Sequence, residues 1–455
     1  MSEPSSLAVP VAPSQSLSWR GVLRAARNNP LQLWTDSAYE QDVERQSFLG
    51  KPRLLLNAPD AIQHVLIREA NHFRRTAPSI RLLRPFVGRG LLLSEGELWR
   101  RQRRVIGPTL APRALPPLMG EAARAIAAAL PALDAAAAAG TPVDLLAAMQ
   151  ALALDIAGRS MFSVAMEMFG VEMRQMFNTA SRDISRPDFF DLVLPIGIPS
   201  PRDVRRWWFQ RRWMGLISRI IAAREAAEGT AGADLFDLLR AACADDGAAG
   251  RRQLRDEVAT MIIAGHETTA LTLFWSAILL ATAPEVQARI AAEAEGLDLG
   301  PEGAPAAQER LPYTRAVVSE ALRLYPPAAV IVREATAETR CGALTIPRGT
   351  LVFISPWVLH RHRKLWTAPE HFDPERFLPG APPVARFAYL PFGAGPRVCV
   401  GAQFALAEAT LVLATLVRRF VITRGDEAPV MPVSVVTTQP DRAPPFHLAA
   451  RPGAA

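Results

Sequence analysis

The stretch LPFGAGPRVCVGAQFALAEATLVLATL, residues 390–416, decides the fold of this chain. Its first half is a glycine-rich loop around Cys399, and its second half has the apolar spacing of a helix. Glycine lets a backbone approach a flat cofactor closely. A cysteine just before a helix N-terminus faces backbone N–H groups and the positive end of the helix dipole, which favour the thiolate. Cys399 is therefore a candidate metal ligand, although a lone cysteine in such a turn is more often structural.

The fixed positions of this loop follow the order Phe-x-x-Gly-x-Arg-x-Cys-x-Gly, which resembles the haem-binding signature of the cytochrome P450 superfamily. The matching residues are Phe392, Gly395, Arg397, Cys399 and Gly401, with Gly393 among them. The resemblance implies a soluble bacterial haem-thiolate monooxygenase with haem b (iron protoporphyrin IX) as cofactor and Cys399 as the iron ligand. It also implies cofactor contacts from the rest of the loop, namely Phe392, Gly393, Arg397 and Gly401. Arg397 is placed to meet an anionic group such as a haem propionate.

A second segment, MIIAGHETTALTLF (residues 261–274), lies within one long helical pattern from Arg251 to Ala283. Its polar cluster, residues 266–269, interrupts an otherwise apolar helix. Gly265 weakens the helix locally, and Thr268 is expected to donate its hydroxyl to the carbonyl of Ala264 and so to bend it. The expected result is a notch with an acid and a hydroxyl beside a cavity, as proton delivery during oxygen activation requires.

The notch resembles the P450 motif (A/G)Gx(D/E)T. The resemblance implies that Thr268 hydrogen-bonds the bound oxygen, that Glu267 relays protons with ordered water, and that Ala264 and Gly265 lie over the haem face. Taken without the cysteine loop, a satisfied polar pair in the core with no chemistry would be the better explanation of this motif. His266 is expected to be a packing residue, because no partner lies at metal-ligand spacing.

Two charged motifs precede the cysteine loop. SEALRLYPP carries Glu320 and Arg323, which share one face of a predicted helix, and FDPERF carries Arg376. They resemble the ExxR and PERF segments of P450s, which implies a buried network of the three side chains. Buried charges are costly unless they are paired, so such a network specifies geometry more than stability. A lone ExxR pair would equally fit a solvated surface.

The segment ELWRRQRR, residues 97–104, carries Trp99 and Arg103. It resembles the P450 motif WxxxR, which implies that both residues bind a haem propionate. Arg333 in AVIVREA lies where many relatives have a further propionate ligand. The planar guanidinium of arginine matches a carboxylate. Arg103, however, lies in a run of arginines, and such side chains are often solvated or face a partner.

The substrate pocket is predicted by position, and its small and apolar residues suit a hydrophobic molecule. The candidates, besides the loop 85–93, are Met261, Ile262, Ala264, Thr269, Ala328, Ala329, Val330, Thr437 and Thr438. The aromatic segment 187–213 has three readings: an access lid, a peripheral membrane contact, or ordinary packing.

The composition limits partners and location. The net charge of +7 fits a basic docking face for an acidic protein, although codon bias explains the arginine excess as well. Nucleic acid is not expected, because no basic run is interleaved with aromatics. The three cysteines form no CxxC or zinc spacing, and the N-terminus does not resemble a signal peptide, so we expect a cytoplasmic protein. The apolar stretch Ala270–Ala283 is shorter than the roughly 20 residues of a bilayer span, which predicts a core helix and no stable membrane insertion.

The predicted fold is mainly α, the cytochrome P450 fold, with a large helical part and a small β-rich part. We expect a single domain over residues 1–455, a flexible N-terminal segment of about 1–18, and β structure mostly within 50–80 and 328–360. The segment 229–250 is rich in Ala, Gly and Asp and is expected to be a loop.

The expected reaction is haem-dependent hydroxylation or epoxidation of a small-to-medium hydrophobic substrate with O2 and two electrons. The chain ends 56 residues after Cys399, so the electrons are expected from a separate ferredoxin or flavodoxin with its NAD(P)H reductase. One alternative is a peroxide-driven peroxygenase or isomerase, but those relatives usually lack the acid–alcohol pair. The other is a non-enzymatic haem sensor, which leaves the notch without a purpose.

Overall fold

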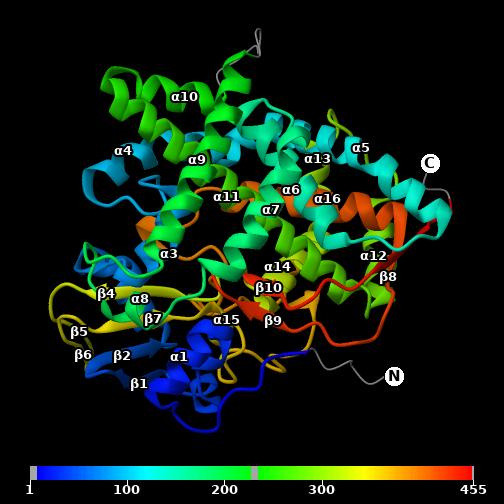
Figure 1. Cartoon of the computed structure of the whole chain (residues 1–455). Helices are drawn as coiled ribbons and strands as arrows, with labels where there is room; N and C mark the ends of the chain where they lie inside the picture. Colours follow the sequence, from blue (N-terminus) through cyan, green and yellow to red (C-terminus); the bar gives the residue numbers. More distant parts are fainter. Residues whose placement is uncertain (1–7, 227–233, 453–455) are drawn as a thin grey trace.

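The computed structural model describes residues 8–226 and 234–452 (Figure 1). A helical part makes up most of the molecule, and a smaller β-rich part lies beside the N-terminal helix α1. The predicted mainly α architecture with a small β-rich part is what the structure shows. The longer helices are α1 (Trp19–Asn28), α3 (Ala77–Val87), α4 (Gly96–Ile106), α5 (Leu115–Ala139), α6 (Leu145–Phe162), α7 (Glu167–Asp183), α9 (Asp203–Ala226), α10 (Leu235–Ala242), α11 (Gly247–Leu280), α12 (Pro284–Ala294), α14 (Pro312–Leu324) and α16 (Ala402–Arg419), and the short ones are α2 (Pro59–Gln63), α8 (Phe189–Val193), α13 (Ala304–Ala307) and α15 (Pro356–Leu359).

The helix ends follow local chemistry. Gly140 ends α5 in the left-handed conformation, with a φ of 63°, and the Asp144 side chain accepts the N–H of Ala147 at the start of α6. The prolines at 326–327 follow the end of α14, because proline cannot continue a helix. These signals are local, which is why the sequence located the elements well.

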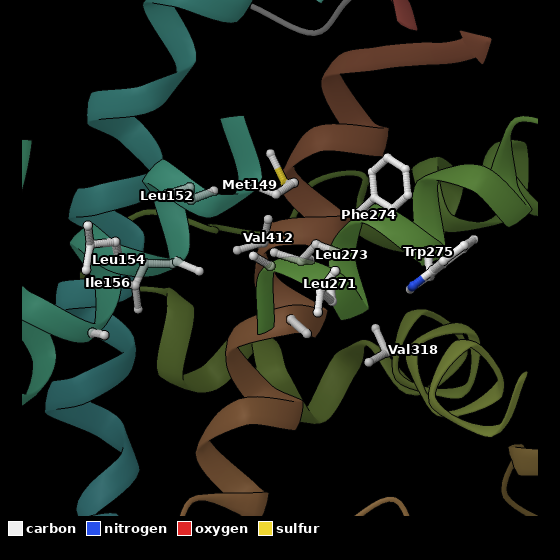
Figure 2. Close-up of a cluster of buried hydrophobic side chains, with 14 of the residues drawn as sticks. Met149, Leu152, Leu154, Ile156, Leu271, Leu273, Phe274, Trp275, Val318 and Val412 are labelled. Atoms are coloured by element: carbon white, nitrogen blue, oxygen red, sulfur yellow. The ribbon is translucent and has the colours of Figure 1, made fainter. Parts of the chain in front are cut away.

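Helix α11 runs through the centre of the core. Its second half is buried on nearly every face, as its continuous apolar sequence predicts. Figure 2 shows Leu271, Leu273 and Phe274 of this helix in one cluster with side chains of α6, Val412 of α16 and Val318 of α14. The cysteine loop and the charged motifs are thereby attached to one packed frame.

The largest sheet among the described residues has the strand order β1-β2-β7-β4-β3. Strands β2 and β7 are parallel, and the other neighbours are antiparallel. Three hairpins or strand pairs, β5–β6, β9–β10 and β8–β11, complete the described β structure. The strands are β1 (Val43–Phe48), β2 (Lys51–Leu56), β3 (Phe73–Arg74), β4 (Ile331–Ala335), β5 (Thr339–Cys341), β6 (Leu344–Ile346), β7 (Leu351–Ile354), β8 (Phe420–Arg424), β9 (Pro432–Ser434), β10 (Thr438–Pro440) and β11 (Phe446–Ala450).

The segment 229–250 differs from its prediction as a loop. Residues 227–233 lie outside the described residues, but α10 occupies Leu235–Ala242. Asp234 caps this helix by accepting the N–H of Asp237, and the buried side chains of Phe236 and Leu239 attach it to the core. The sequence did not predict this short amphipathic helix, because the residues around it are typical of a loop. The helix is stabilised by burial of its apolar side chains in the tertiary structure.

The predicted flexible segment 1–18 is described from residue 8 onward. There, Val9 and Ala12 pack against the core, and the carbonyl of Pro13 accepts the N–H of Asp36 at 3.0 Å. Residues 1–7 lie outside the described part of the chain.

Three helices in the described part of the chain are long and apolar enough to cross a membrane by length and composition. They are Pro112–Ala139, Leu145–Phe162 and Ala244–Leu280, and their most apolar windows are 28%, 67% and 72% buried inside the protein. The two most buried windows belong to α6 and α11, whose apolar residues form the core described above.

Candidate functional site

Cys399 lies between a single 3₁₀ turn, Gly395–Arg397, and the start of α16. Its N–H donates to the carbonyl of Phe392 at 2.9 Å, which closes the loop. Burial raises the pKa of the Cys399 thiol and outweighs the N–H of Gly401 and the guanidinium of Arg103, which lower that pKa. The N–H of Gly401 favours the thiolate, as the sequence argument expects, but burial opposes it. A metal cation bound at the sulfur would supply further positive charge in favour of the thiolate.

Gly395 shows why this loop needs glycine. It has a φ of 74°, and a Cβ at this position would lie 2.0 Å from the carbonyl oxygen of Leu66. The backbone of the loop therefore packs directly on the helical turn His64–Arg68, which any side chain at position 395 would prevent.

Cys399 is exposed, yet surrounding protein desolvates its thiol. Together these two observations indicate that the sulfur borders a space partly enclosed by protein. Ala264, in the middle of α11, and Ala328, between two buried residues, are exposed in the same way. Interior elements that leave small side chains uncovered indicate room for a large ligand.

The ion-pair network lies at the centre of the fold. The guanidinium of Arg323 donates to both oxygens of Glu320, at 2.6 and 2.7 Å, and both side chains are fully buried. Arg376 lies 3.5 Å from Glu320, and the N–H of Asp373 donates to the same carboxylate at 2.9 Å. Arg323 also donates to the carbonyls of residues 360, 369 and 371, so α14 is attached to the chain that leads to the cysteine loop.

His360 extends this network to the cysteine loop. Its Nε2 accepts the N–H of Leu390 at 2.8 Å, and its Nδ1 lies 3.2 Å from the carbonyl of Arg323. Burial lowers the pKa of His360 to about 3, so the ring is neutral, with its proton on Nδ1. Sequence reasoning missed His360, because no motif singles it out.

Four arginines converge beside the cysteine loop: Arg75, Arg103, Arg333 and Arg397. Burial, together with repulsion from neighbouring guanidinium groups, lowers the pKa of Arg333 and of Arg397 to about 10. Among the described residues, Glu95 forms salt bridges with Arg75, at 3.0 Å, and with Arg397. Positive charge in this half-buried cluster exceeds what Glu95 balances, which suits an anionic ligand. Sequence reasoning missed Arg75 and Glu95.

Trp99 belongs to the same cluster. The guanidinium of Arg397 lies over its ring, 4.6 Å from the centroid. Arg103 donates to the carbonyl of Val398 at 2.7 Å, and Arg333 donates to that of Val332 at 2.9 Å. The structure thus brings together the residues that the sequence proposed as propionate ligands, from α4, β4 and the cysteine loop.

The hydrogen bond predicted within α11 is present, and the helix is continuous from Gly247 to Leu280. The hydroxyl of Thr268 donates to the carbonyl of Ala264 at 2.6 Å. Gly265 requires a correction, because a Cβ there would lie 3.2 Å from Met161 and 3.6 Å from Ala157 on α6. Its missing side chain serves the close packing of α6 on α11, whereas its neighbour Ala264 is exposed.

His266 packs as the sequence predicts. Its ring lies 5.4 Å from that of Phe177, and burial lowers its pKa to about 4. A neutral, buried imidazole beside an aromatic ring is a core residue. In the described part of the chain, no group of three His, Cys, Asp or Glu residues could hold a metal ion.

Glu267 contacts the C-terminal hairpin β9–β10. Its Oε1 accepts hydrogen bonds from Gln439 at 2.6 Å and from Thr437 at 3.0 Å. Burial raises the pKa of Glu267, and the two hydrogen bonds oppose this rise. Sequence reasoning placed Thr437 in the pocket and did not include Gln439 at all.

The predicted pocket residues divide into two groups. Ala264 and Ala328 are exposed, and Val330 and Thr437 lie at the margin of burial. Met261, Ile262, Thr269, Ala329 and Thr438 are buried. Two of these require a correction: Ile262 and Thr438 have no exposed surface, and the hydroxyl of Thr438 donates to the carbonyl of Pro326.

The aromatic segment 187–213 is largely uncovered. Its exposed large apolar residues are Phe189, Phe190, Ile196, Ile198, Val204, Trp207 and Trp208. Ordinary core packing therefore does not explain it. Arg81 on α3 donates to four backbone carbonyls of this segment, the shortest being that of Ile198 at 2.7 Å. A groove of about 360 Å³ lies between α3 and the segment.

Comparison with known proteins explains the site. The family model described as cytochrome P450 matches residues 19–443. The chain belongs to the cytochrome P450 family. It is similar to cyclooctatin synthase of Streptomyces melanosporofaciens, with 32% identity over 86% of this chain and 85% of the relative. Cyclooctat-9-en-7-ol 5-monooxygenase of the same organism is 34% identical over 74% and 73% of the two chains, and pentalenene oxygenase of Streptomyces avermitilis is 32% identical over 69% and 70%.

A solved structure supports the fold. The crystal structure of a cytochrome P450, CYP102L1, superposes with a TM-score of 0.77, covers 95% of this chain and 98% of that one, and shares 21% identity. The predicted P450 fold is confirmed. A plant relative, the Arabidopsis thaliana protein LUTEIN DEFICIENT 5, chloroplastic, is 31% identical over 92% of this chain and 73% of its own, so the relatives are not confined to bacteria.

P450 enzymes are haem b oxidoreductases of the monooxygenase class, and this protein is one of them. The described residues fit the cofactor. Cys399 borders a partly enclosed space, Gly401 directs an N–H at its sulfur, and the arginine cluster carries the excess positive charge that two propionates would neutralise.

Proposed function

We propose that this P450 inserts one oxygen atom from O2 into a C–H or C=C bond of a small-to-medium hydrophobic molecule. The observations that carry the proposal are the exposed Cys399, whose thiol is desolvated by protein, and the hydroxyl of Thr268 on the carbonyl of Ala264 in α11. The haem supplies the oxygen chemistry once it is bound, with Cys399 as its ligand and with Trp99, Arg103, Arg333 and Arg397 on its propionates.

The side chains of α11 have separate tasks in this proposal. The hydroxyl of Thr268 bonds to a backbone carbonyl and keeps the helix open, and its oxygen remains available as an acceptor. Burial raises the pKa of the Glu267 carboxyl group, which favours its protonated form. A carboxyl group that is protonated nearer to neutral pH is a better proton donor for the reaction. Apolar core residues behind the pocket exclude bulk water.

The substrate class rests on the exposed alanines and on the relatives. Ala264 and Ala328 offer an apolar surface with little steric bulk. Two relatives are named for pentalenene and cyclooctat-9-en-7-ol, and both names denote olefins. We infer that the substrate is an apolar, olefin-type skeleton that enters through the groove beside α3, with segment 187–213 as a lid.

The electrons come from a separate protein in this proposal. The excess of basic residues suits a small acidic ferredoxin or flavodoxin with its NAD(P)H reductase, in the cytoplasm of a bacterium. Nucleic acid has no role in this function.

The test begins with the absorption difference spectrum of the reduced protein with carbon monoxide. We expect the long-wavelength band typical of thiolate-ligated haem, and we expect Cys399→Ser to abolish it. Substrate turnover with a ferredoxin system is then measured for the wild type and for Thr268→Ala. The variant should form about 10-fold less product per reductant consumed. Turnover with peroxide but with no reductase system would instead support the peroxygenase alternative. Absence of oxygen consumption with every reductant would support a haem sensor.

A further inference from the structure

The hairpin β9–β10 touches α11 at its acidic residue. Thr437 directly precedes β10, in which successive side chains point to opposite sides, so Thr438 and Gln439 face different ways. The hydrogen bonds follow this alternation, because Thr437 and Gln439 both donate to Oε1 of Glu267, whereas Thr438 donates to the carbonyl of Pro326.

The hairpin is anchored firmly enough to fix the position of these donors. The N–H of Thr438 donates to the carbonyl of Pro327 at 2.9 Å, and its own carbonyl accepts the indole N–H of Trp275 at 2.9 Å. At the paired strand, Asn29 donates to the carbonyl of Pro432 at 2.9 Å. Backbone contacts thus attach the hairpin to α11, to the end of α14 and to the segment after α1.

We propose that Gln439 is a positioning residue, which holds the carboxyl group of Glu267 toward the hairpin and sets how readily it gives up its proton. The inference rests on the proposed proton-relay role of Glu267 and deepens it. The amide N–H of Gln439 favours the charged carboxylate, and burial opposes that charge. Beyond burial and the two hydrogen bonds, no charged side chain of the described residues contributes to the pKa of Glu267.

The hairpin therefore links the proton donor to the pocket. Thr438 is bonded to the backbone at 326–327, immediately before the exposed Ala328. A substrate that presses on this wall also presses on the strand that carries Gln439. The position of Glu267 is in this way tied to the shape of the substrate space, by contacts 170 or more residues apart in sequence.

The experiment uses two substitutions with opposite expectations in the haem-loaded protein. Gln439→Leu removes the donor and should raise the pKa of Glu267 by about one unit, whereas Gln439→Lys places a cation there and should lower it by a similar amount. The infrared carboxyl band of Glu267, assigned by its loss in Glu267→Gln, is titrated with pH and does not depend on turnover. The pH profile of product formed per reductant consumed should shift in the same directions.

If Gln439 had only a structural role, both substitutions should shift the pKa of Glu267 in the same direction. Equal or same-signed shifts for the leucine and lysine variants would overturn the inference. Gln46→Leu is the matched control, because it removes a 2.7 Å bond from a glutamine amide to Glu44 on distant β1, and it should shift nothing. Thr437→Val, which removes the other donor, should raise the pKa less and replaces the leucine variant if that variant misfolds.

The proton-relay role of Glu267 is tested separately from the positioning role of Gln439. If Glu267→Gln leaves product formation fully coupled, the proton-relay role is wrong, whatever the infrared titration shows. If Glu267→Gln uncouples the reaction but Gln439→Leu leaves the band and the profile unchanged, only the role of Gln439 is wrong.

Discussion

The Nε2 atom of His360 accepts the N–H of Leu390 at 2.8 Å, directly before the loop that carries Cys399. On its other side, the same ring donates to the carbonyl of Arg323, 3.2 Å away. One neutral imidazole thus joins the buried ion pair to the cysteine loop. This chain of contacts helps to fix the start of the cysteine loop, together with the hydroxyl of Tyr389, which donates to the carbonyl of Ser319 at 2.8 Å.

We predict that His360→Phe keeps the volume of the ring but leaves the N–H of Leu390 without an acceptor. A buried unsatisfied donor costs about 1–3 kcal/mol, so the free energy of unfolding should fall by roughly 2 kcal/mol. Urea denaturation measures this loss, and the carbon monoxide spectrum should show a larger share of the short-wavelength form that marks a lost or protonated thiolate. The exposed His447 on β11 offers a control, since His447→Phe should change neither quantity.

Breaking the central ion pair should be costly. Arg323→Met leaves Glu320 buried without its bidentate partner, and we expect a loss of about 3–5 kcal/mol in unfolding free energy, measured by denaturation. The pair Arg289–Glu375 is exposed, so Arg289→Met should cost less than about 1 kcal/mol. Similar losses for the two variants would contradict the assignment of the buried pair as the organising contact.

The arginine cluster should strengthen haem binding and lower the stability of the haem-free protein. Arg333→Leu removes a buried cation that its neighbours repel, so the haem-free protein should be at least as stable as the wild type. Haem should nevertheless dissociate about 10-fold faster, because a charge-assisted bond to a propionate is lost. Transfer of haem to a scavenger protein measures that rate. The exposed Arg74 provides a control, since Arg74→Leu should leave haem release unchanged. If haem release from the Arg333 variant were also unchanged, Arg333 would not belong to the cofactor site.

Glu257 should make stability fall with rising pH. Its carboxylate on α11 accepts the N–H of Leu91 at 3.0 Å, and burial raises its pKa to about 7, so the folded protein keeps a proton that the unfolded chain loses near pH 4.5. The group therefore stabilises the fold below that lower pH, and this contribution declines as pH rises to about 7 and beyond. Relative to the wild type, Glu257→Gln should gain on the order of 3 kcal/mol between pH 5 and pH 8 by denaturation. A pH-independent difference between the two proteins would contradict this account.

Several elements were accessible from the sequence because their causes are local. The apolar run of α11, the caps of α5 and α6 and the glycines around Cys399 each lie within one short segment. The bond from Thr268 to Ala264 joins residues one helical turn apart, so spacing alone predicted it. Helix α10 was missed because its stability comes from burial against other elements and not from its composition.

The sequence by itself determined the family and the mainly helical fold, and it singled out Cys399 and the acid–alcohol motif as candidates, since these depend on residues near one another in the chain. Only the tertiary structure decided that Gly265 faces α6, that Thr438 turns away from the pocket, and that Gln439 reaches Glu267. It also decided that Arg75 and Glu95 join the arginine cluster and that His360 supports the cysteine loop. These contacts join segments far apart in sequence, and their partners are selected by packing and by the need to satisfy buried polar groups, which no short pattern records.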